Sequence, residues 1–177
     1  TPTRRQRQMC IRDRFMACEK GHEEVVRLLL AHAATDVNQA TTTDGATPLL
    51  MACVKGHEGV VRLLLAHAAT DVNQATTTDG ATPLLMACVK GHEGVVRLLL
   101  AHAATDVNQA TTDTGATPLF MACQDGHEGV VRLLLAHAAT DVNQATTDTG
   151  ATPLFMACQD GHEGVVRLLL AHAATDV

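Results

Sequence analysis

The chain has 177 residues and a formal net charge of −6, and 46% of its residues are hydrophobic although only 2% are aromatic. Its core must therefore be built from Leu, Val, Ala and Met. No apolar run approaches the roughly 20 residues that a membrane-spanning helix needs, so we expect no membrane insertion. Beyond residue 14 the chain carries 8 basic against 18 acidic residues, a net of −10. Because affinity for a phosphate backbone depends on basic side chains, nucleic acid is excluded as the expected partner.

Residues 1–14 are an atypical N-terminal segment. Arg12-Asp13-Arg14 stands where later parts of the chain read Thr-Pro-Leu, and the shared pattern begins at Phe15. Foreign sequence joined to a repeat, a polar cap and a basic targeting arm all remain open for this segment. Because the chain starts at Thr1 and stops at Val177, one residue short of the Asn found in earlier copies, we expect it to be part of a larger protein.

Residues 15–177 form a tandem array of about five copies, of which the first and last are incomplete. Residues 44–78 differ from residues 79–113 only at the last position, and residues 114–142 are identical to residues 149–177. The period is 35 residues, marked by Gly21, Gly56, Gly91, Gly126 and Gly161. A fixed period of this size predicts a solenoid in which each unit contacts only its neighbours.

Each copy predicts two short helices. Thr47 can cap a helix whose first turn contains Pro48, so the first helix should cover about residues 48–54. Gly56 can end it in the left-handed conformation, and a second helix should cover about residues 58–66. Isolated helices shorter than about 12 residues are marginal in water, and the second helix is apolar around most of its circumference. We therefore expect stacked helix pairs that bury two faces.

A threonine-rich segment follows each helix pair. Residues 72–80 end in Asp-Gly, which favours a turn between extended residues. We expect a hairpin-like loop, called the finger below, that projects from the helices. Leu64→Ala should cost about 2 to 5 kcal/mol because it leaves a cavity in the core, whereas Thr76→Ala on an exposed finger should change little.

The repeated unit resembles the ankyrin repeat. The residues that carry the resemblance are Thr47-Pro48-Leu49, Ala52, Gly56-His57, Val60-Val61, Leu63-Leu64-Leu65 and Asp71-Val72-Asn73. It implies an all-α, ankyrin-type helix-turn-helix solenoid whose finger tips and first helices line a concave face that holds protein partners. The family's Thr-Pro-Leu-His ends here in Leu or Phe, so we expect the hydrogen bonds of that histidine to be absent.

Cysteine and histidine each recur at fixed positions of the repeat. Packed helices lie about 8 to 10 Å apart, too far for a disulfide between neighbouring copies, and a ladder with one histidine per repeat does not converge on one zinc ion. We expect small core-filling cysteines, histidines in polar contacts at turns and helix ends, and no metal, cofactor or catalytic set. Reduced thiols favour an intracellular, cytoplasmic location.

Function should reside in the positions that differ between copies. One such position reads Lys20, Lys55, Lys90, Asp125 and Asp160 along the array, a charge split that would orient a partner with an acidic and a basic end. The expected partner-binding residues are Leu50, Lys55, Asp79, Leu85, Lys90, Asp113, Phe120, Asp125, Asp148, Phe155 and Asp160. We predict a protein–protein interaction module and no enzyme. A structural spacer between domains and a regulatory segment of an enzyme outside this chain are the alternatives, and the oligomeric state stays open.

Overall fold

The computed structural model describes residues 4–31, 36–172 and 174–175, with side chains from residue 12 onward. These residues form ten helices and no strands. The first helices of the repeats are α1 (Arg4–Glu19), α3 (Pro48–Lys55), α5 (Pro83–Val89), α7 (Pro118–Gln124) and α9 (Pro153–Gln159). The second helices are α2 (Glu23–Leu30), α4 (Glu58–Leu65), α6 (Glu93–Leu100), α8 (Glu128–Leu135) and α10 (Glu163–Ala171).

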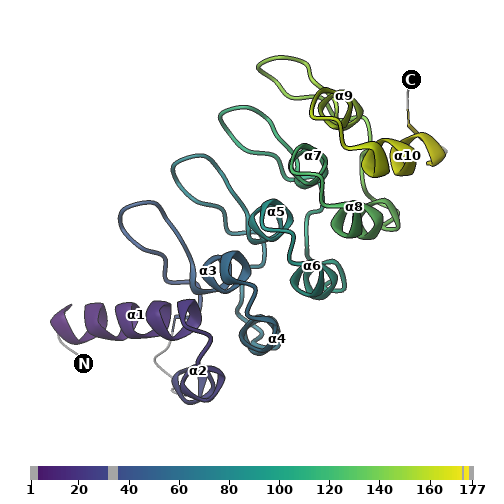
Figure 1. The fold of residues 1–177 in the computed structure, drawn as a ribbon. Helices are drawn as coiled ribbons and strands as arrows, with labels where there is room; N and C mark the ends of the chain where they lie inside the picture. Colours follow the sequence, from purple (N-terminus) through teal and green to yellow (C-terminus); the bar gives the residue numbers. More distant parts are fainter. Residues whose placement is uncertain (1–3, 32–35, 173, 176–177) are drawn as a thin grey trace.

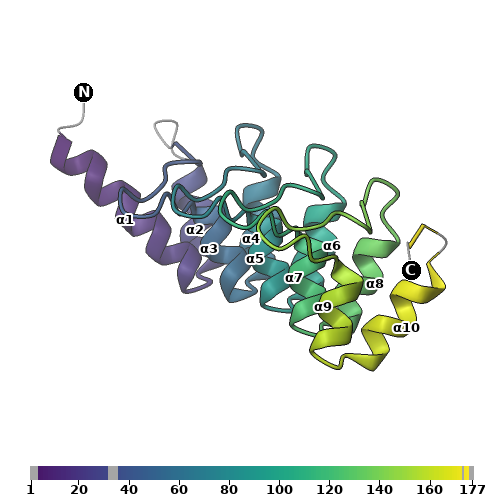
Figure 2. The same cartoon turned by 90° about the horizontal axis from the view of Figure 1, so that it is seen from above.

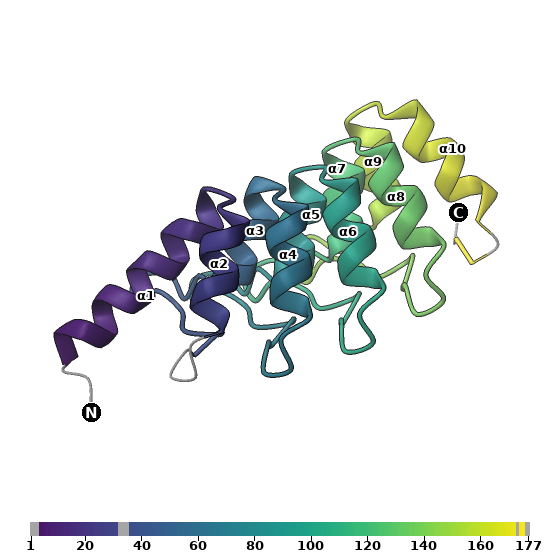
Figure 3. The same ribbon diagram turned by 90° about the horizontal axis from the view of Figure 1, so that it is seen from below.

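The helices stand in two parallel rows, and the fingers project from the row of first helices on the side away from the second helices (Figure 1). Seen from above, the repeats follow one another in a single elongated stack (Figure 2). The row of second helices covers the opposite side (Figure 3). This confirms the predicted all-α helix-turn-helix solenoid. None of the helices within the described ranges is both long and apolar enough to span a membrane.

Local sequence sets where the helices begin and end. The hydroxyl of Thr47 accepts a hydrogen bond from the backbone N–H of Leu50 at 3.1 Å, and Pro48 occupies the first turn. Gly56 follows α3 with φ of 75°, a left-handed conformation that L side chains rarely adopt. The expected helices at about residues 48–54 and 58–66 are therefore confirmed within one residue at each end.

The core runs continuously through the stack. Leu64 of α4 and Val60 beside it have no exposed surface, and Ala52 and Cys53 of α3 are equally buried. Each helix packs on its counterparts in the neighbouring repeats, α3 on α1 and α5, and α4 on α2 and α6. Helices of seven or eight residues obtain their stability from these contacts, because they are too short to persist alone.

Helix α1 differs from the other first helices. It begins at Arg4 and continues without a break past residue 14, so the atypical segment and the start of the first repeat share one helix. Arg14 is only 4% exposed and donates a hydrogen bond to the carbonyl of Asp36. Its counterpart in the next repeat is the buried Leu49, so an arginine takes the place of a core leucine at the N-terminal end.

Three of the expected partner-binding residues lie in the core instead of on the surface. Leu50 is 4% exposed, Leu85 is 3% exposed and Phe120 is 7% exposed. Each follows the capping threonine by three residues and is buried, and Phe120 packs against Met156 of the next repeat. The variation from Leu to Phe keeps the position apolar, which suits a buried side chain. Phe155, at the same position in the last repeat, is 55% exposed.

Candidate protein-interaction surface

The fingers and the exposed parts of the first helices form one side of the array, called the groove side below (Figure 1). Between finger and first helix this side is hollowed. One hollow of about 340 Å³ lies beside α7 and is lined by residues that include Phe120, Gln124 and Asp148. A larger hollow of about 570 Å³ lies beside α9 and includes Phe155 and Gln159. Phe120 thus contributes to the smaller hollow although its side chain is only 7% exposed.

Each finger is closed by hydrogen bonds at its base. In the finger that follows α4, the N–H of Thr76 donates to the carbonyl of Ala81 at 3.0 Å, and the N–H of Ala81 donates to the hydroxyl of Thr76 at 2.8 Å. That hydroxyl in turn donates to the carboxylate of Asp79. The bond from Thr76 is the main reason why the pKa of Asp79 lies below its ordinary value. The carboxylate of Asp79 therefore stabilises the finger by accepting hydrogen bonds inside it.

Neighbouring fingers are also joined to one another. The N–H of Thr77 donates to the carbonyl of Asp44 at 2.9 Å, and the N–H of Thr112 donates to that of Asp79 at 2.8 Å. The N–H of Thr147 continues the series to Thr114 at 2.8 Å. The fingers thus form a connected row. A surface held in place in this way loses little conformational entropy when a partner binds.

The order of two residues at the finger tip decides where the carboxylate lies. Asp79 is followed by glycine and stays half-buried against Thr76. In the next finger the order is reversed, so Thr114 takes the inner place, 2.9 Å from the hydroxyl of Thr111, and Asp113 becomes exposed at the tip. Asp148 is exposed in the same way in the last finger. The exchange therefore moves a negative charge outward in the C-terminal half of the array.

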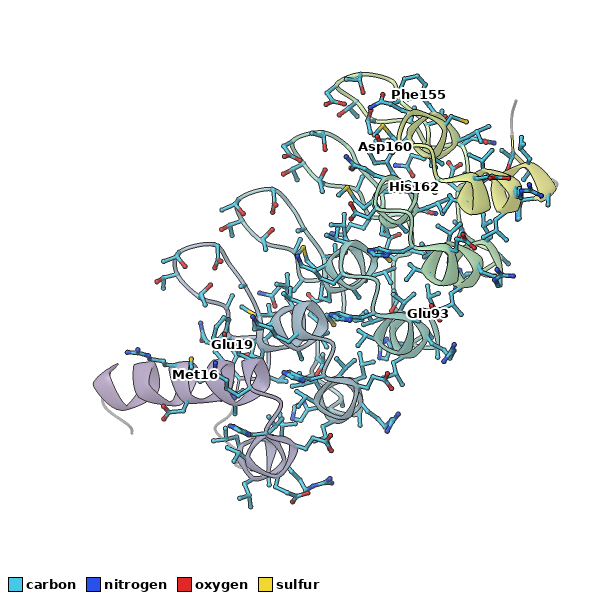
Figure 4. All side chains as sticks on the ribbon, viewed as in Figure 1. Met16, Glu19, Glu93, Phe155, Asp160 and His162 are labelled. Carbon is cyan, nitrogen blue, oxygen red and sulfur yellow. The ribbon has the colours of Figure 1, made fainter. Side chains whose placement is uncertain are left out.

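The charge split at the ends of the first helices lies on the surface. Lys55 and Lys90 are exposed in the second and third repeats, and Asp125 and Asp160 are exposed in the fourth and fifth. The Nζ atom of Lys55 lies 4.0 Å from a carboxylate oxygen of Glu19, a partly exposed pair that contributes little to stability. Figure 4 places Glu19 on α1 and Asp160 beside α9, at opposite ends of the stack.

The histidine that directly follows the turn glycine of a repeat contacts the backbone of the preceding repeat. The Nε2 atom of His57 lies 2.9 Å from the carbonyl oxygen of Glu19, and His92 makes the same contact with Val54 at 3.1 Å. His127 and His162 repeat it further along. This confirms the expected polar contacts at turns and helix ends. Among the described residues, no three His, Cys, Asp or Glu side chains are grouped to hold a metal ion.

The cysteine ladder lies in the core, as expected for small core-filling residues. Cys18, Cys53, Cys88 and Cys123 are buried free thiols, and burial raises the pKa of Cys123 to about 12. Such thiols stay protonated at neutral pH and are poor nucleophiles. Cys158, at the same position of the last described first helix, is exposed.

The family of the chain follows from this repeating geometry and from a comparison with known sequences. A family model of ankyrin repeats in three copies matches residues 15–111 and also residues 104–177. The chain belongs to the ankyrin repeat family. Ankyrin repeats are generally protein–protein interaction modules, and the fold is typically a non-catalytic binding scaffold. No curated protein matches this ankyrin array.

Of the residues expected to bind a partner, the array exposes a subset on its groove side and at the ends of its first helices. This subset is Lys55, Lys90, Asp113, Asp125, Asp148, Phe155 and Asp160. Asp79 is half-buried in its finger, and Leu50, Leu85 and Phe120 belong to the core. Sequence reasoning did not identify Thr76 as the residue that closes the finger. Its identical placement five residues before an alanine in every copy was the available signal.

Proposed function

We propose that the groove side of this ankyrin array binds an elongated protein partner, with the first repeats facing an acidic part of it and the last two facing a basic part. The supporting observation is where the copies differ. Nearly identical repeats exchange Lys55 and Lys90 for Asp125 and Asp160 at exposed positions. The same two repeats carry Asp113 and Asp148 outward at their finger tips. One change thus adds negative charge to this half of the array, and the other moves an existing negative charge outward there.

The row of hydrogen-bonded fingers supports this proposal further. A partner lying along the array would meet hollows between finger and first helix, one lined by the exposed ring of Phe155 and another in which Phe120 adjoins the carboxylate of Asp148. Apolar contacts at the centre of an interface supply affinity, while charges at its rim steer encounter and exclude partners of the wrong sign. An array with one uniform charge would not distinguish the two orientations of a partner.

A charge-exchange experiment tests the proposal. The array captures its partner from a cell extract, and the association rate of the purified pair is then measured at several salt concentrations. Asp125→Lys with Asp160→Lys should slow association and alter its salt dependence, because rim charges act mainly on encounter. Arg62→Glu with Arg97→Glu, exposed on the second helices, is the matched control and should have much less effect.

The two variants also separate the proposal from its alternatives. Equal losses from both would indicate non-specific attraction. No loss from either, or no captured partner, would favour a structural spacer that holds flanking domains apart. A catalytic domain in the same reading frame would favour a regulatory segment of an enzyme. The four buried free thiols support an intracellular, cytoplasmic location for the array, which imaging of the tagged protein in its host cell would test.

A further inference from the structure

The hollow beside α7, called the α7 pocket below, lies between two neighbouring fingers, the one that precedes α7 and the one that precedes α9 (Figure 1). The residues of its lining that carry the argument are Phe120, Met121, Gln124 and Asp148. Its volume of about 340 Å³ is near the lower end of the range of about 300 to 1,000 Å³ that is usual for small-molecule sites. The α7 pocket therefore suits one side chain of a partner better than a larger group.

Part of the lining of the α7 pocket is apolar. Ala116 and Phe120 are buried, and both belong to a small core cluster with Met156 of the next repeat. Met121 packs against the same cluster, is half-buried and lines the pocket. An alkyl chain placed along Met121 would remove apolar surface from water, which favours binding.

The rest of the lining carries hydrogen-bond acceptors. Asp148 is exposed, and its carboxylate accepts a hydrogen bond from the N–H of Thr149 at 2.7 Å. A carboxylate has about four acceptor positions, so that of Asp148 can also accept from donors of a partner. Gln124, on α7, is half-buried in the same lining and supplies an amide oxygen. A carboxylate and an amide thus lie beside an apolar surface.

The charge of Asp148 has no counterpart on this side of the array. Among the described residues, Asp148 takes part in no salt bridge. Beyond Lys90, the Lys and Arg residues of the chain are Arg97, Arg132 and Arg167. All three lie on second helices, α6, α8 and α10, which cover the opposite side (Figure 3). A cation that pairs with Asp148 must therefore come from a partner.

The earlier copies lack this combination of residues. At the equivalent place beside α3, Val54 stands where α7 has Gln124, and Thr78 stands where the next finger has Asp148. Beside α5 the next finger does carry an exposed aspartate, but Val89 takes the place of the glutamine. The carboxylate and the amide first occur together beside α7, in an array whose copies are otherwise nearly identical.

We propose that the α7 pocket binds one basic side chain, lysine or arginine, of the protein partner. The aliphatic stem lies along Met121 and Phe120, and the charged group donates hydrogen bonds to the carboxylate of Asp148 and the amide oxygen of Gln124. Lysine and arginine suit this lining because each joins an apolar stem to a cationic head. The inference rests on the proposed function, since it gives the basic part of the partner a point of contact on the groove side.

Titration with three short peptides tests the inference. Each is an alanine peptide with one central residue, which is arginine, lysine or the uncharged norleucine, and its ends are acetylated and amidated to remove the terminal charges. NMR spectra of the protein labelled at its methionine methyl groups follow Met121. Both cationic peptides should shift the Met121 signal in a saturable way, whereas the norleucine peptide should shift it far less.

A variant that copies another finger isolates the position of the carboxylate. Asp148→Thr with Thr149→Asp restores the residue order of the earlier fingers, keeps the net charge and places the carboxylate inside the finger, as in Asp79. It should weaken binding of both cationic peptides about three- to tenfold, through the loss of one charged contact. Glu128→Gln, which removes an exposed charge on α8, is the control and should leave the affinity nearly unchanged.

Three outcomes would overturn the inference: cationic peptides that leave Met121 unshifted up to the limit of their solubility, a norleucine peptide that binds as tightly, or a finger variant that binds them as well as wild type. In each case a captured partner whose association depends on Asp125 and Asp160 would leave the proposed function standing. Peptide binding as expected, in an array that captures no partner, would support the α7 pocket and count against the proposed function alone.

Discussion

The side-chain amide of Asn73 donates a hydrogen bond to the carbonyl oxygen of Ala104, which lies 2.6 Å away and 31 residues later in the chain. The amide oxygen of the same side chain accepts a hydrogen bond from the N–H of Asp106 at 2.9 Å. One asparagine thus binds two backbone groups, two residues apart, in the loop that follows the next second helix, α6. Asn38 and Asn108 make the same pair of bonds one repeat before and one repeat after.

We expect Asn73→Ala to lower the free energy of unfolding by about 1 to 3 kcal/mol, since it removes two hydrogen bonds worth about 0.5 to 1.5 kcal/mol each. Gln74→Ala, at the adjacent position, is the control. Urea titrations followed by circular dichroism measure both. Equal effects of the two substitutions would mean that the asparagine contact adds nothing to the stack.

Two leucines of similar sequence context should differ sharply in their importance. Leu64→Ala should cost about 2 to 5 kcal/mol, because the side chain is fully buried and its loss leaves a cavity. Leu28→Ala should cost well under about 1 kcal/mol, because Leu28 is 73% exposed. The same titrations compare them in one protein. A large effect at Leu28 would contradict the exposure of its side chain.

Thr76→Ala was expected from sequence to change little, and the structure requires a different prediction. The Thr76 hydroxyl accepts from Ala81 and donates to Asp79, so its removal should cost about 1 kcal/mol. Thr77→Ala keeps the backbone N–H that pairs with Asp44 and serves as the control. Amide hydrogen exchange of Ala81 should accelerate in the first variant only.

The Thr76–Asp79 contact also predicts a pH effect. The hydroxyl of Thr76 holds the pKa of Asp79 below its ordinary value of about 3.9. A lowered pKa in the folded state stabilises the fold above the ordinary pKa, and this stabilisation is lost as pH falls through the folded-state pKa. In an NMR titration, the midpoint of Asp79 should rise toward the ordinary value in Thr76→Val. Identical midpoints in both proteins would exclude the hydrogen bond as the cause.

Thiol chemistry should separate the cysteines. At pH 8, Cys158 should be alkylated quickly because it is exposed. Cys53 and Cys123 should react slowly, since burial raises their pKa and blocks access. Site-resolved mass spectrometry over a time course measures each rate, and a denatured sample shows the rates without protection. Comparable rates at Cys53 and Cys158 in the folded protein would contradict the buried ladder.

The helices could be predicted because their limits are set by local chemistry. Thr47 and Pro48 specify a beginning, and Gly56 specifies an end, without reference to any other repeat. The charge split between Lys55 and Asp125 was equally visible in sequence. Whether a side chain points inward could not be inferred from variation alone, so sequence did not show that Phe120, expected to bind a partner, is only 7% exposed.

What sequence reasoning missed depends on contacts between repeats. The bonds of Asn73 and the series from Thr77 to Asp44 join residues about a full repeat apart, and such pairs have no local signal. The continuous helix α1 was missed for a related reason. Its first turns share no pattern with the other copies, so the repeat offered no template for residues 4–14.

Because the contacts between neighbouring repeats are nearly the same along the array, they bear on how its number of repeats can change in evolution. His57 meets the carbonyl of Glu19 as His162 meets that of Gln124, both at 2.9 Å, so any unit fits before or after any other. Gain or loss of one 35-residue unit by unequal crossing-over would therefore leave every surviving junction intact. Selection can then lengthen or shorten the molecule in whole steps without passing through a misfolded intermediate.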